Sequence, residues 1–198
     1  MARPRVHDEA LAEVLLEEAT RIVGLEGPES LSLRRITHSA GTSTSAIYSL
    51  YGSRDALLDA VYQRAITSFA QATVVRATDR PLVDLFTMGL LYRRWALKHT
   101  HMYPVMFGRR HADSPAEIRE RTRPTVEPLL ECVGRCIEAN LLRGDPHEIV
   151  THLWATVHGF VALELDGLMT HSLLADASED RGPAFETLLR ASVCYWRV

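Results

Sequence analysis

Apolar residues in this chain recur at spacings of three and four positions, and the alternation typical of strands is almost absent. Within residues 8–24, for example, Leu11, Leu15 and Ile22 fall on one side of a helix. This period is that of an α-helix, whereas a half-buried strand repeats its apolar residues every two positions. The spacing therefore predicts an all-α protein.

Capping residues, glycines and prolines divide the apolar stripes into successive helices. Ser32 caps a short second helix that ends before Gly41 and has Ile36 facing inward, and Ser43 or Thr44 opens a third helix that carries Ile47. Ser53 caps a fourth helix, predicted to run to about residue 75. The later predicted helices cover residues 81–99, 102–107, a segment that Ser114 caps and that bends or breaks at Pro124 and Pro128, a helix over 146–169 that Asp145 caps, and finally 183–196.

Composition places the chain among soluble proteins. Of its 198 residues 46% are hydrophobic and 24% charged, and the mean hydropathy is −0.05. We expect no membrane segment, because no apolar run approaches the roughly 18 to 20 residues that a spanning helix needs. No apolar stretch typical of a secretory signal follows the N-terminus. Three cysteines make an odd, sparse set that favours the reducing cytoplasm.

The distribution of charge is more informative than its sum. The formal net charge is −3, which is not typical of a nucleic-acid binder. Between Glu29 and Asp55, however, there is no acidic residue, and the same window contains Arg34, Arg35 and Arg54. The field at a docking surface governs contact with phosphates, so this window predicts a locally basic face.

Residues 30–62 have the organisation of a helix-turn-helix: two short helices joined at a glycine turn and packed by a longer helix before them. In this motif the second short helix enters the major groove. Its exposed positions here are small and hydroxyl-bearing, apart from one tyrosine. Such side chains donate to phosphates and base edges and let the backbone approach the groove. They are Ser43, Thr44, Ser45, Tyr48 and Ser49.

This segment resembles the TetR family of regulators over roughly the first third of the chain. The resemblance rests on Ala40-Gly41-Thr42-Ser43, Ile47-Tyr48, Tyr51 and the run from Ser53 to Leu58, in that order and spacing. Two positions depart from the family pattern. Thr42 stands where valine is usual, and Gly52 stands where lysine is common, which removes one phosphate contact.

The resemblance implies a role for each matching residue. Arg34 would reach a base, while Tyr48 and Arg54 would hold the DNA backbone. The alternatives are a core aromatic for Tyr48 and a solvated helix face for Arg34 and Arg35. The full set of expected DNA-binding residues is Arg34, Ser43, Thr44, Ser45, Ala46, Tyr48, Ser49 and Arg54.

A second signature lies in the later part of the chain. The run from Leu153 to Gly159 resembles the Trp…His-Gly element of one TetR C-terminal subclass, and Trp154 and His158 share a helix face. The functional interpretation places both beside an effector pocket, whereas the alternative places them in the core or the dimer interface. The expected pocket residues are Trp95, Tyr103, Met106, Phe107, Trp154 and His158.

Two other functional classes compete with this interpretation. A helical enzyme is disfavoured because no metalloprotease motif, nucleophile elbow or phosphate loop is present, so we expect neither catalysis nor a cofactor nor a metal site. Cys132 and Cys136 lie one helical turn apart and would suit a thiol sensor, although buried inert cysteines are the simpler interpretation. A ligand-independent architectural DNA-binding protein would have little use for the large second domain.

These observations lead to one overall prediction. Residues 1–52 form a three-helix DNA-binding domain, and residues 53–198 form a helical domain that binds an effector and dimerises. By resemblance, the last two long helices pair with their symmetry mates as a four-helix bundle. The expected protein is a cytoplasmic homodimeric repressor that a small-molecule effector releases from a pseudo-palindromic double-stranded operator. The resemblance leaves activation open as an alternative to repression.

Overall fold

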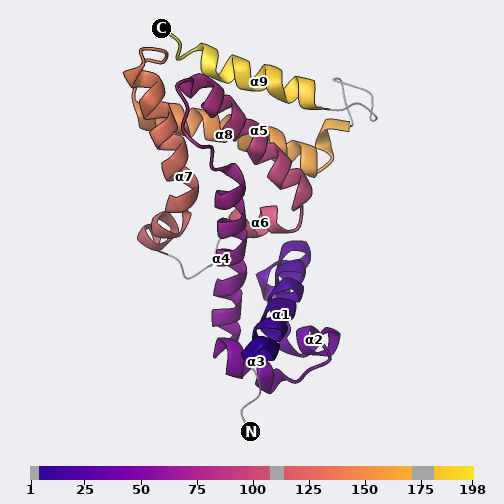
Figure 1. Ribbon diagram of the computed structural model, residues 1–198. Coiled ribbons are helices and arrows are strands. Elements are labelled where there is room, and N and C mark those ends of the chain that lie inside the picture. The colour runs from indigo at the N-terminus through magenta and orange to yellow at the C-terminus, as the bar shows by residue number, and fades with distance from the viewer. Residues whose placement is uncertain (1–4, 108–113, 171–180) are drawn as a thin grey trace. The chain divides into compact units, whose positions relative to one another are not determined.

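The computed structural model describes residues 5–107, 114–170 and 181–198, and over these residues the chain forms helices and no strand (Figure 1). One isolated bridge joins Leu142 and Arg197. The all-α prediction is confirmed, and no described helix is both long and apolar enough to cross a bilayer. The helices are α1 (Arg5–Glu26), η1 (Pro28–Ser30), α2 (Leu33–Ser39), α3 (Thr44–Tyr51), α4 (Arg54–Thr73), α5 (Pro81–Lys98), α6 (Met102–Phe107), α7 (Pro115–Glu138), α8 (Pro146–Leu165), η2 (Leu168–Thr170) and α9 (Gly182–Cys194).

Contacts within the chain define two compact units. The N-terminal unit comprises Met1–Ser68 and His99–Arg121, and the C-terminal unit comprises Phe69–Lys98 and Thr122–Val198. Helix α6 therefore belongs with α1 to α3, although it follows them by a long stretch of chain. The sequence-based boundary after residue 52 concerns functional domains and stays a prediction.

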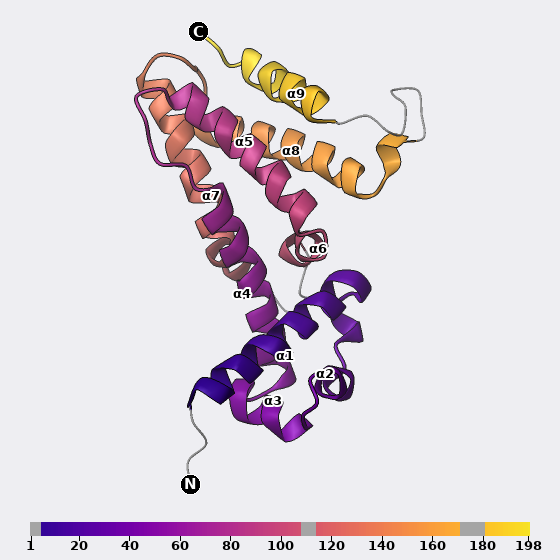
Figure 2. The ribbon, with the colours of Figure 1, turned by 45° about the vertical axis from the view of Figure 1, so that its right-hand side comes forward.

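The N-terminal unit is built on mutual contacts among α1, α2 and α3, which lie together in both views (Figures 1 and 2). Each helix directs apolar side chains into one shared core. Burying a side chain of this size stabilises the fold by roughly 1.5 to 3 kcal/mol, so the core holds the short α2 and α3 in place. Its fully buried members include Leu15, Ile22, Ile36 and Ile47, and Leu57 and Val61 of the following helix α4 are fully buried as well.

Helix α6 packs against α1 at Gly24. A Cβ atom placed on Gly24 would lie only 1.8 Å from the backbone oxygen of His101, just before α6. The two backbones approach this closely because glycine has no side chain. Helix α1 continues past Gly24 and ends at Glu26.

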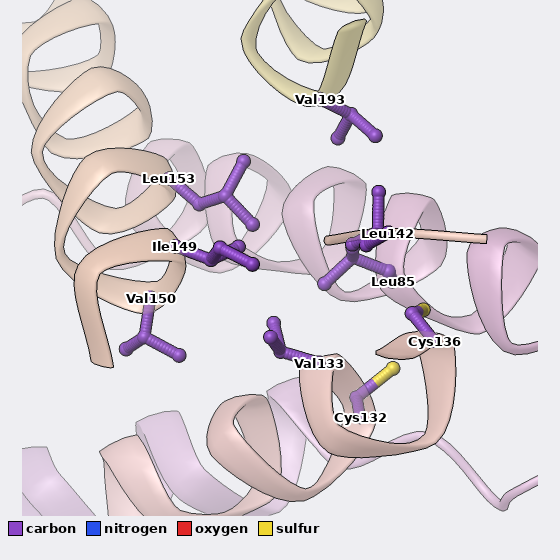
Figure 3. Packing of buried hydrophobic residues seen from close by; sticks show 9 residues of the cluster. All are labelled: Leu85, Cys132, Val133, Cys136, Leu142, Ile149, Val150, Leu153 and Val193. Carbon is purple, nitrogen blue, oxygen red and sulfur yellow. The ribbon is translucent and has the colours of Figure 1, made fainter. Parts of the chain in front are cut away.

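In the C-terminal unit, α5, α8 and α9 contact one another, and α7 contributes to the same core. Figure 3 shows Leu85 of α5, Val133 of α7 and Ile149 of α8 converging on a common interior. Cys132 and Cys136 lie in this cluster and are buried. Their burial agrees with the interpretation that both cysteines are chemically inert.

Three predicted helix caps are confirmed by hydrogen bonds of their side chains. Ser32 accepts a hydrogen bond from the backbone amide of Arg35 at 3.5 Å. Asp145 accepts from the amides of His147 and Glu148 at 2.9 and 3.0 Å. Ser114 and Glu117 form the reciprocal capping box. Each cap satisfies amides that would otherwise lack a partner at the start of a helix.

Several predicted helix ends require correction. Helix α8 ends at Leu165 rather than at residue 169, because Gly167 adopts a left-handed φ of 68° and η2 follows. Helix α9 ends at Cys194 rather than at residue 196, and α4 ends at Thr73. Helix α7 does not break at its prolines but is continuous from Pro115 to Glu138.

Candidate nucleic-acid interface and effector site

Helix α2 is a short element whose two sides differ in burial. Ile36 and Thr37 are buried, and the Thr37 hydroxyl donates to the backbone oxygen of Leu33 at 2.9 Å. Arg34 and His38 are exposed and lie one helical turn apart. His38 was not among the predicted DNA-binding residues, although its spacing from Arg34 was a usable signal.

A tight turn leads from α2 into α3. Gly41 adopts a φ of 61°, a left-handed conformation that favours glycine, and the amide of Thr42 donates to the oxygen of Thr37 at 2.9 Å. Helix α3 then starts at Thr44 after Ser43, whose hydroxyl lies 2.6 Å from that of Ser45. The helix-turn-helix geometry predicted for this segment is therefore present.

The exposed side of α3 carries hydroxyl groups and no charge. Ile47 is fully buried and anchors the helix, whereas Ser43, Ser45 and Ser49 are exposed. Thr44 and Ala46 are half-buried beside them. None of the eight residues of α3 is ionised at neutral pH. This surface is suited to close approach and neutral hydrogen bonding.

The two tyrosines of α3 have different environments. Tyr51 donates its hydroxyl to the backbone oxygen of Ala12 on α1 at 2.6 Å, and burial raises the pKa of Tyr51. Tyr48 is 55% exposed, so it is not the core aromatic that the alternative interpretation proposed. Tyr51 thus fixes α3 to α1, while the Tyr48 hydroxyl lies on the side of α3 that is open to solvent.

The arginines near these helices have three different environments. Arg35 forms a bidentate pair with Glu26, with N–O distances of 2.7 and 2.6 Å, and this pairing lowers the pKa of the Glu26 carboxyl. Arg54 donates to the backbone oxygens of Leu31 and Pro28 at 3.1 and 2.9 Å. The Arg34 guanidinium has no such partner within the described residues.

Two predicted effector residues of the C-terminal unit, Trp95 and His158, contact an aromatic pair formed by Phe69 and Tyr92. Trp95 is 3% exposed and meets the ring of Phe69 edge to face at 5.1 Å, as does Tyr92. The Tyr92 hydroxyl lies 3.2 Å from Nδ1 of His158, and burial lowers the pKa of His158. The neutral imidazole is therefore favoured, with Nδ1 able to accept from the tyrosine. Phe69 and Tyr92 were not among the predicted pocket residues.

Trp154 and His158 lie near each other on α8, with ring centroids 5.9 Å apart. Trp154 is 45% exposed in the single chain, so it is not a core residue of its own unit. The remaining predicted pocket residues belong to α6 in the N-terminal unit. Tyr103 and Met106 are buried there, and the ring of Tyr103 meets that of Phe107 at 4.8 Å. The six predicted pocket residues are thus divided between the two units.

Two largely buried ion pairs join different helices of the C-terminal unit. Arg93 and Glu164 form a bidentate pair at 2.8 and 2.6 Å. Asp84 is 2% exposed and accepts from Thr78 and from Arg135, the latter at 2.7 Å. These hydrogen bonds, led by those from Thr78, lower the pKa of Asp84 to about 2. Both pairs join helices that are separate in the sequence.

Within the described residues, no group of three or more histidine, cysteine or acidic side chains is arranged to hold a metal ion. Cys132 accepts from Arg135 at 3.6 Å, and its pKa is lowered mainly by a hydrogen bond with Cys136. Both thiols are nevertheless buried in the core.

Family comparisons match both parts of the chain. Residues 15–61 match the family described as bacterial regulatory proteins, tetR family. Residues 85–191, more than half of the chain, match the family described as tetracyclin repressor-like, C-terminal domain. No curated protein sequence matches the chain.

Solved structures share the fold over nearly the whole chain. A protein of unknown function from Rhodococcus sp. RHA1 is 26% identical, with 92% of this chain and 95% of that chain covered and a TM-score of 0.73. A TetR family transcription regulator from Marinobacter aquaeolei VT8 is 19% identical, with 98% and 99% covered and a TM-score of 0.76. The TetR family regulator PfmR from Thermus thermophilus is 19% identical, with 89% and 97% covered and a TM-score of 0.66.

Proposed function

The chain belongs to the TetR family of DNA-binding transcriptional regulators, and we propose that it is a cytoplasmic repressor that a small-molecule effector releases from a pseudo-palindromic operator. The observation that carries the proposal is the exposed, uncharged, hydroxyl-bearing side of α3, held by Ile47 and Tyr51. A helix of this kind enters the major groove and reads base edges at close range.

Residue roles follow from exposure. Arg34 reads a base, because its guanidinium has no partner among the described residues. Tyr48 contacts a phosphate through its exposed hydroxyl. Arg54 supports the DNA-binding surface by holding the chain before α2, and any contact it makes with DNA would compete with that role. The groove-facing residues are Ser43, Thr44, Ser45, Ala46 and Ser49.

The operator is tested by selection from a random library of DNA duplexes. A two-fold dimer with one reading helix per subunit should enrich an inverted repeat whose half-sites lie about 34 to 36 Å apart or somewhat more. A folded, dimeric protein that enriches no inverted repeat would contradict the proposal.

Homodimerisation is proposed through α8 and α9. In the single chain α8 exposes Leu163, and a Cβ on Gly159, one helical turn before it, would meet no atom within 4 Å. Close pairing with a symmetry mate would bury this face and use the small residue for backbone approach.

The dimer interface is tested with two matched glycines. Gly159→Leu should yield monomers in analytical ultracentrifugation, because the added side chain would hold two copies of α8 apart. Gly134→Leu on α7 is the control, since Gly134 has equally open surroundings within its own chain. Equal dimer affinity for both variants would exclude α8 from the interface.

The effector is proposed to be a largely apolar small molecule that binds in the C-terminal unit beside Trp95, Trp154 and His158. Aromatic side chains suit such ligands, and the His158 imidazole adds one polar contact. Once a screen by thermal shift finds a compound, calorimetry with and without operator tests it. A true inducer lowers the affinity of the protein for operator by some factor. Thermodynamic linkage then requires operator to lower the affinity for the inducer by the same factor. Identical ligand affinities would show a bound compound that is not the inducer.

A further inference from the structure

The DNA-binding region of this regulator is negatively charged overall. Between Leu11 and Tyr62 the sequence has seven Asp and Glu residues against four arginines, and no lysine. Most double-stranded DNA-binding surfaces gain affinity from cations that displace the counterions condensed on the phosphates. In this region the number of such cations depends on how many arginines are not already paired within the protein.

Three of the four arginines are occupied by the protein. Arg21 pairs with Glu18 at 2.9 and 2.8 Å, Arg35 pairs with Glu26, and Arg54 donates to two backbone oxygens. The Arg35–Glu26 pair has an additional reason to persist. Glu26 is the last residue of α1, where the negative end of the helix dipole disfavours an unpaired carboxylate. Moving Arg35 to a phosphate would leave that carboxylate unpaired beside a polyanion.

Arg34 is the remaining arginine, and its guanidinium has no partner within the described residues. The adjacent surface of α3 offers only neutral hydroxyl groups. A hydroxyl donates to a phosphate without carrying a charge, so it releases no counterion. The charge of Arg34 displaces condensed counterions from the nearby phosphates even when its guanidinium contacts a base, so each DNA-binding region should act as about one cation in the salt dependence.

We infer that the regulator binds its operator mainly through neutral contacts, with Arg34 as the principal cation of each DNA-binding region, and therefore has little affinity for other DNA. The inference rests on the proposed function and concerns how the same surface recognises its partner. Non-specific binding is almost entirely electrostatic. A surface with few available cations binds random DNA weakly, so most of its operator affinity must come from neutral contacts, including those to base edges.

The salt dependence of operator binding measures the number of cations directly, since log K falls with log[salt] with a slope of about −0.9 for each phosphate neutralised. The duplex is the inverted repeat recovered by selection, with a scrambled duplex of the same composition as reference. Arg3 and Arg5, which lie outside the residues whose side chains are described, are first replaced by glutamine to remove any contribution of the N-terminal arm. In this background the dimer should show a slope of about −2.

Arg34 and Arg35 provide a matched pair of variants, because they are neighbours with the same side chain. Arg34→Gln should bring the slope close to zero, whereas Arg35→Gln should leave it unchanged. Arg34→Lys should restore the slope while reducing preference at one base pair, because lysine lacks the planar fork of arginine. Circular dichroism of every variant establishes that it is folded.

The outcomes separate this inference from the proposed function. Failure to bind any selected duplex would overturn both. Operator binding with a slope steeper than about −4 in the arm-free background, or an equal loss of slope in Arg34→Gln and Arg35→Gln, would overturn the inference alone. The first result would reveal additional cations, and the second would show that Arg35 leaves Glu26 for a phosphate. Shallow slopes that respond only to Arg34 support it.

Discussion

The ion pairs that join separate helices are exposed in the N-terminal unit and largely buried in the C-terminal unit. In the N-terminal unit, the Arg35 and Glu26 side chains are 45% and 38% exposed. In the C-terminal unit, the Arg93 and Glu164 side chains are only 16% and 12% exposed, and Asp84 is almost fully enclosed. A surface ion pair contributes little to stability, whereas a buried one is costly to break. Substitutions of polar residues should therefore affect binding in the N-terminal unit and stability in the C-terminal unit.

The largest expected effect is that of Asp84→Ala. This change removes the acceptor of two hydrogen bonds from Thr78 and one from Arg135, and leaves their donors unpaired at the start of α5. We expect the Tm to fall by about 5 to 10 °C, by the usual scaling for a chain of this length. Asp55→Ala, at a carboxyl that is 78% exposed, is the control and should change the Tm by about 1 °C or less.

The pH dependence of stability provides an independent check on Asp84. Its pKa is about 2 in the folded protein against an ordinary value of 3.8. Because the folded pKa is the lower one, the carboxylate stabilises the fold fully above pH 3.8 and loses this effect as the pH falls towards 2. The stability difference between the unsubstituted protein and Asp84→Ala should shrink over that interval. A difference that stays constant would contradict the assignment.

Gly24→Ala should have the next largest effect. The new methyl group would collide with the backbone oxygen of His101, so α6 and α1 must separate. Such overpacking costs about 1 to 3 kcal/mol, measurable by urea unfolding. Gly134→Ala is the matched control, because its Cβ would meet nothing within 4 Å on α7 and alanine favours a helix. Equal stability of the two variants would mean that α6 does not need the close approach.

A smaller effect is expected from Tyr92→Phe, which removes the hydroxyl that faces His158. The loss should be about 0.5 to 1.5 kcal/mol in urea unfolding at pH 7.5. Burial lowers the pKa of His158 from 6.5, so the neutral imidazole stabilises the fold above pH 6.5 and this contribution disappears as the pH falls below that value. His158→Gln should reduce the sensitivity to this acidification, and an unchanged pH profile would contradict the role given to burial.

The smallest effect on stability is expected from Tyr48→Phe in the N-terminal unit. The hydroxyl is exposed and should change the free energy of unfolding by less than about 0.5 kcal/mol. Operator affinity should nevertheless fall, by a similar factor on specific and random duplexes, because a phosphate contact carries no sequence information. If Tyr48→Phe lowered the free energy of unfolding but left operator affinity unchanged, Tyr48 would contribute to stability rather than to binding, contrary to this prediction.

Local features of this protein were predictable from the sequence. Ser32, Ser114 and Asp145 cap their helices as expected, because a capping side chain bonds to amides only two or three residues away. The burial of Ile36 and Ile47 followed from helical periodicity. The helix-turn-helix and the family resemblance depend on such short-range patterns, and both family comparisons agree with them.

Pairings between distant residues were decided only by the tertiary structure. The sequence placed Arg35 and Arg54 in a basic window, yet Arg35 meets Glu26 and Arg54 meets the chain before α2. The contact of Tyr92 with His158 likewise joins α5 to α8. An arginine or tyrosine has several partners of the right chemistry, and the choice among them depends on helix packing rather than on neighbours in sequence. For this reason the sequence determined which residues carry polar groups, and the fold determined which of those groups remain available to bind DNA.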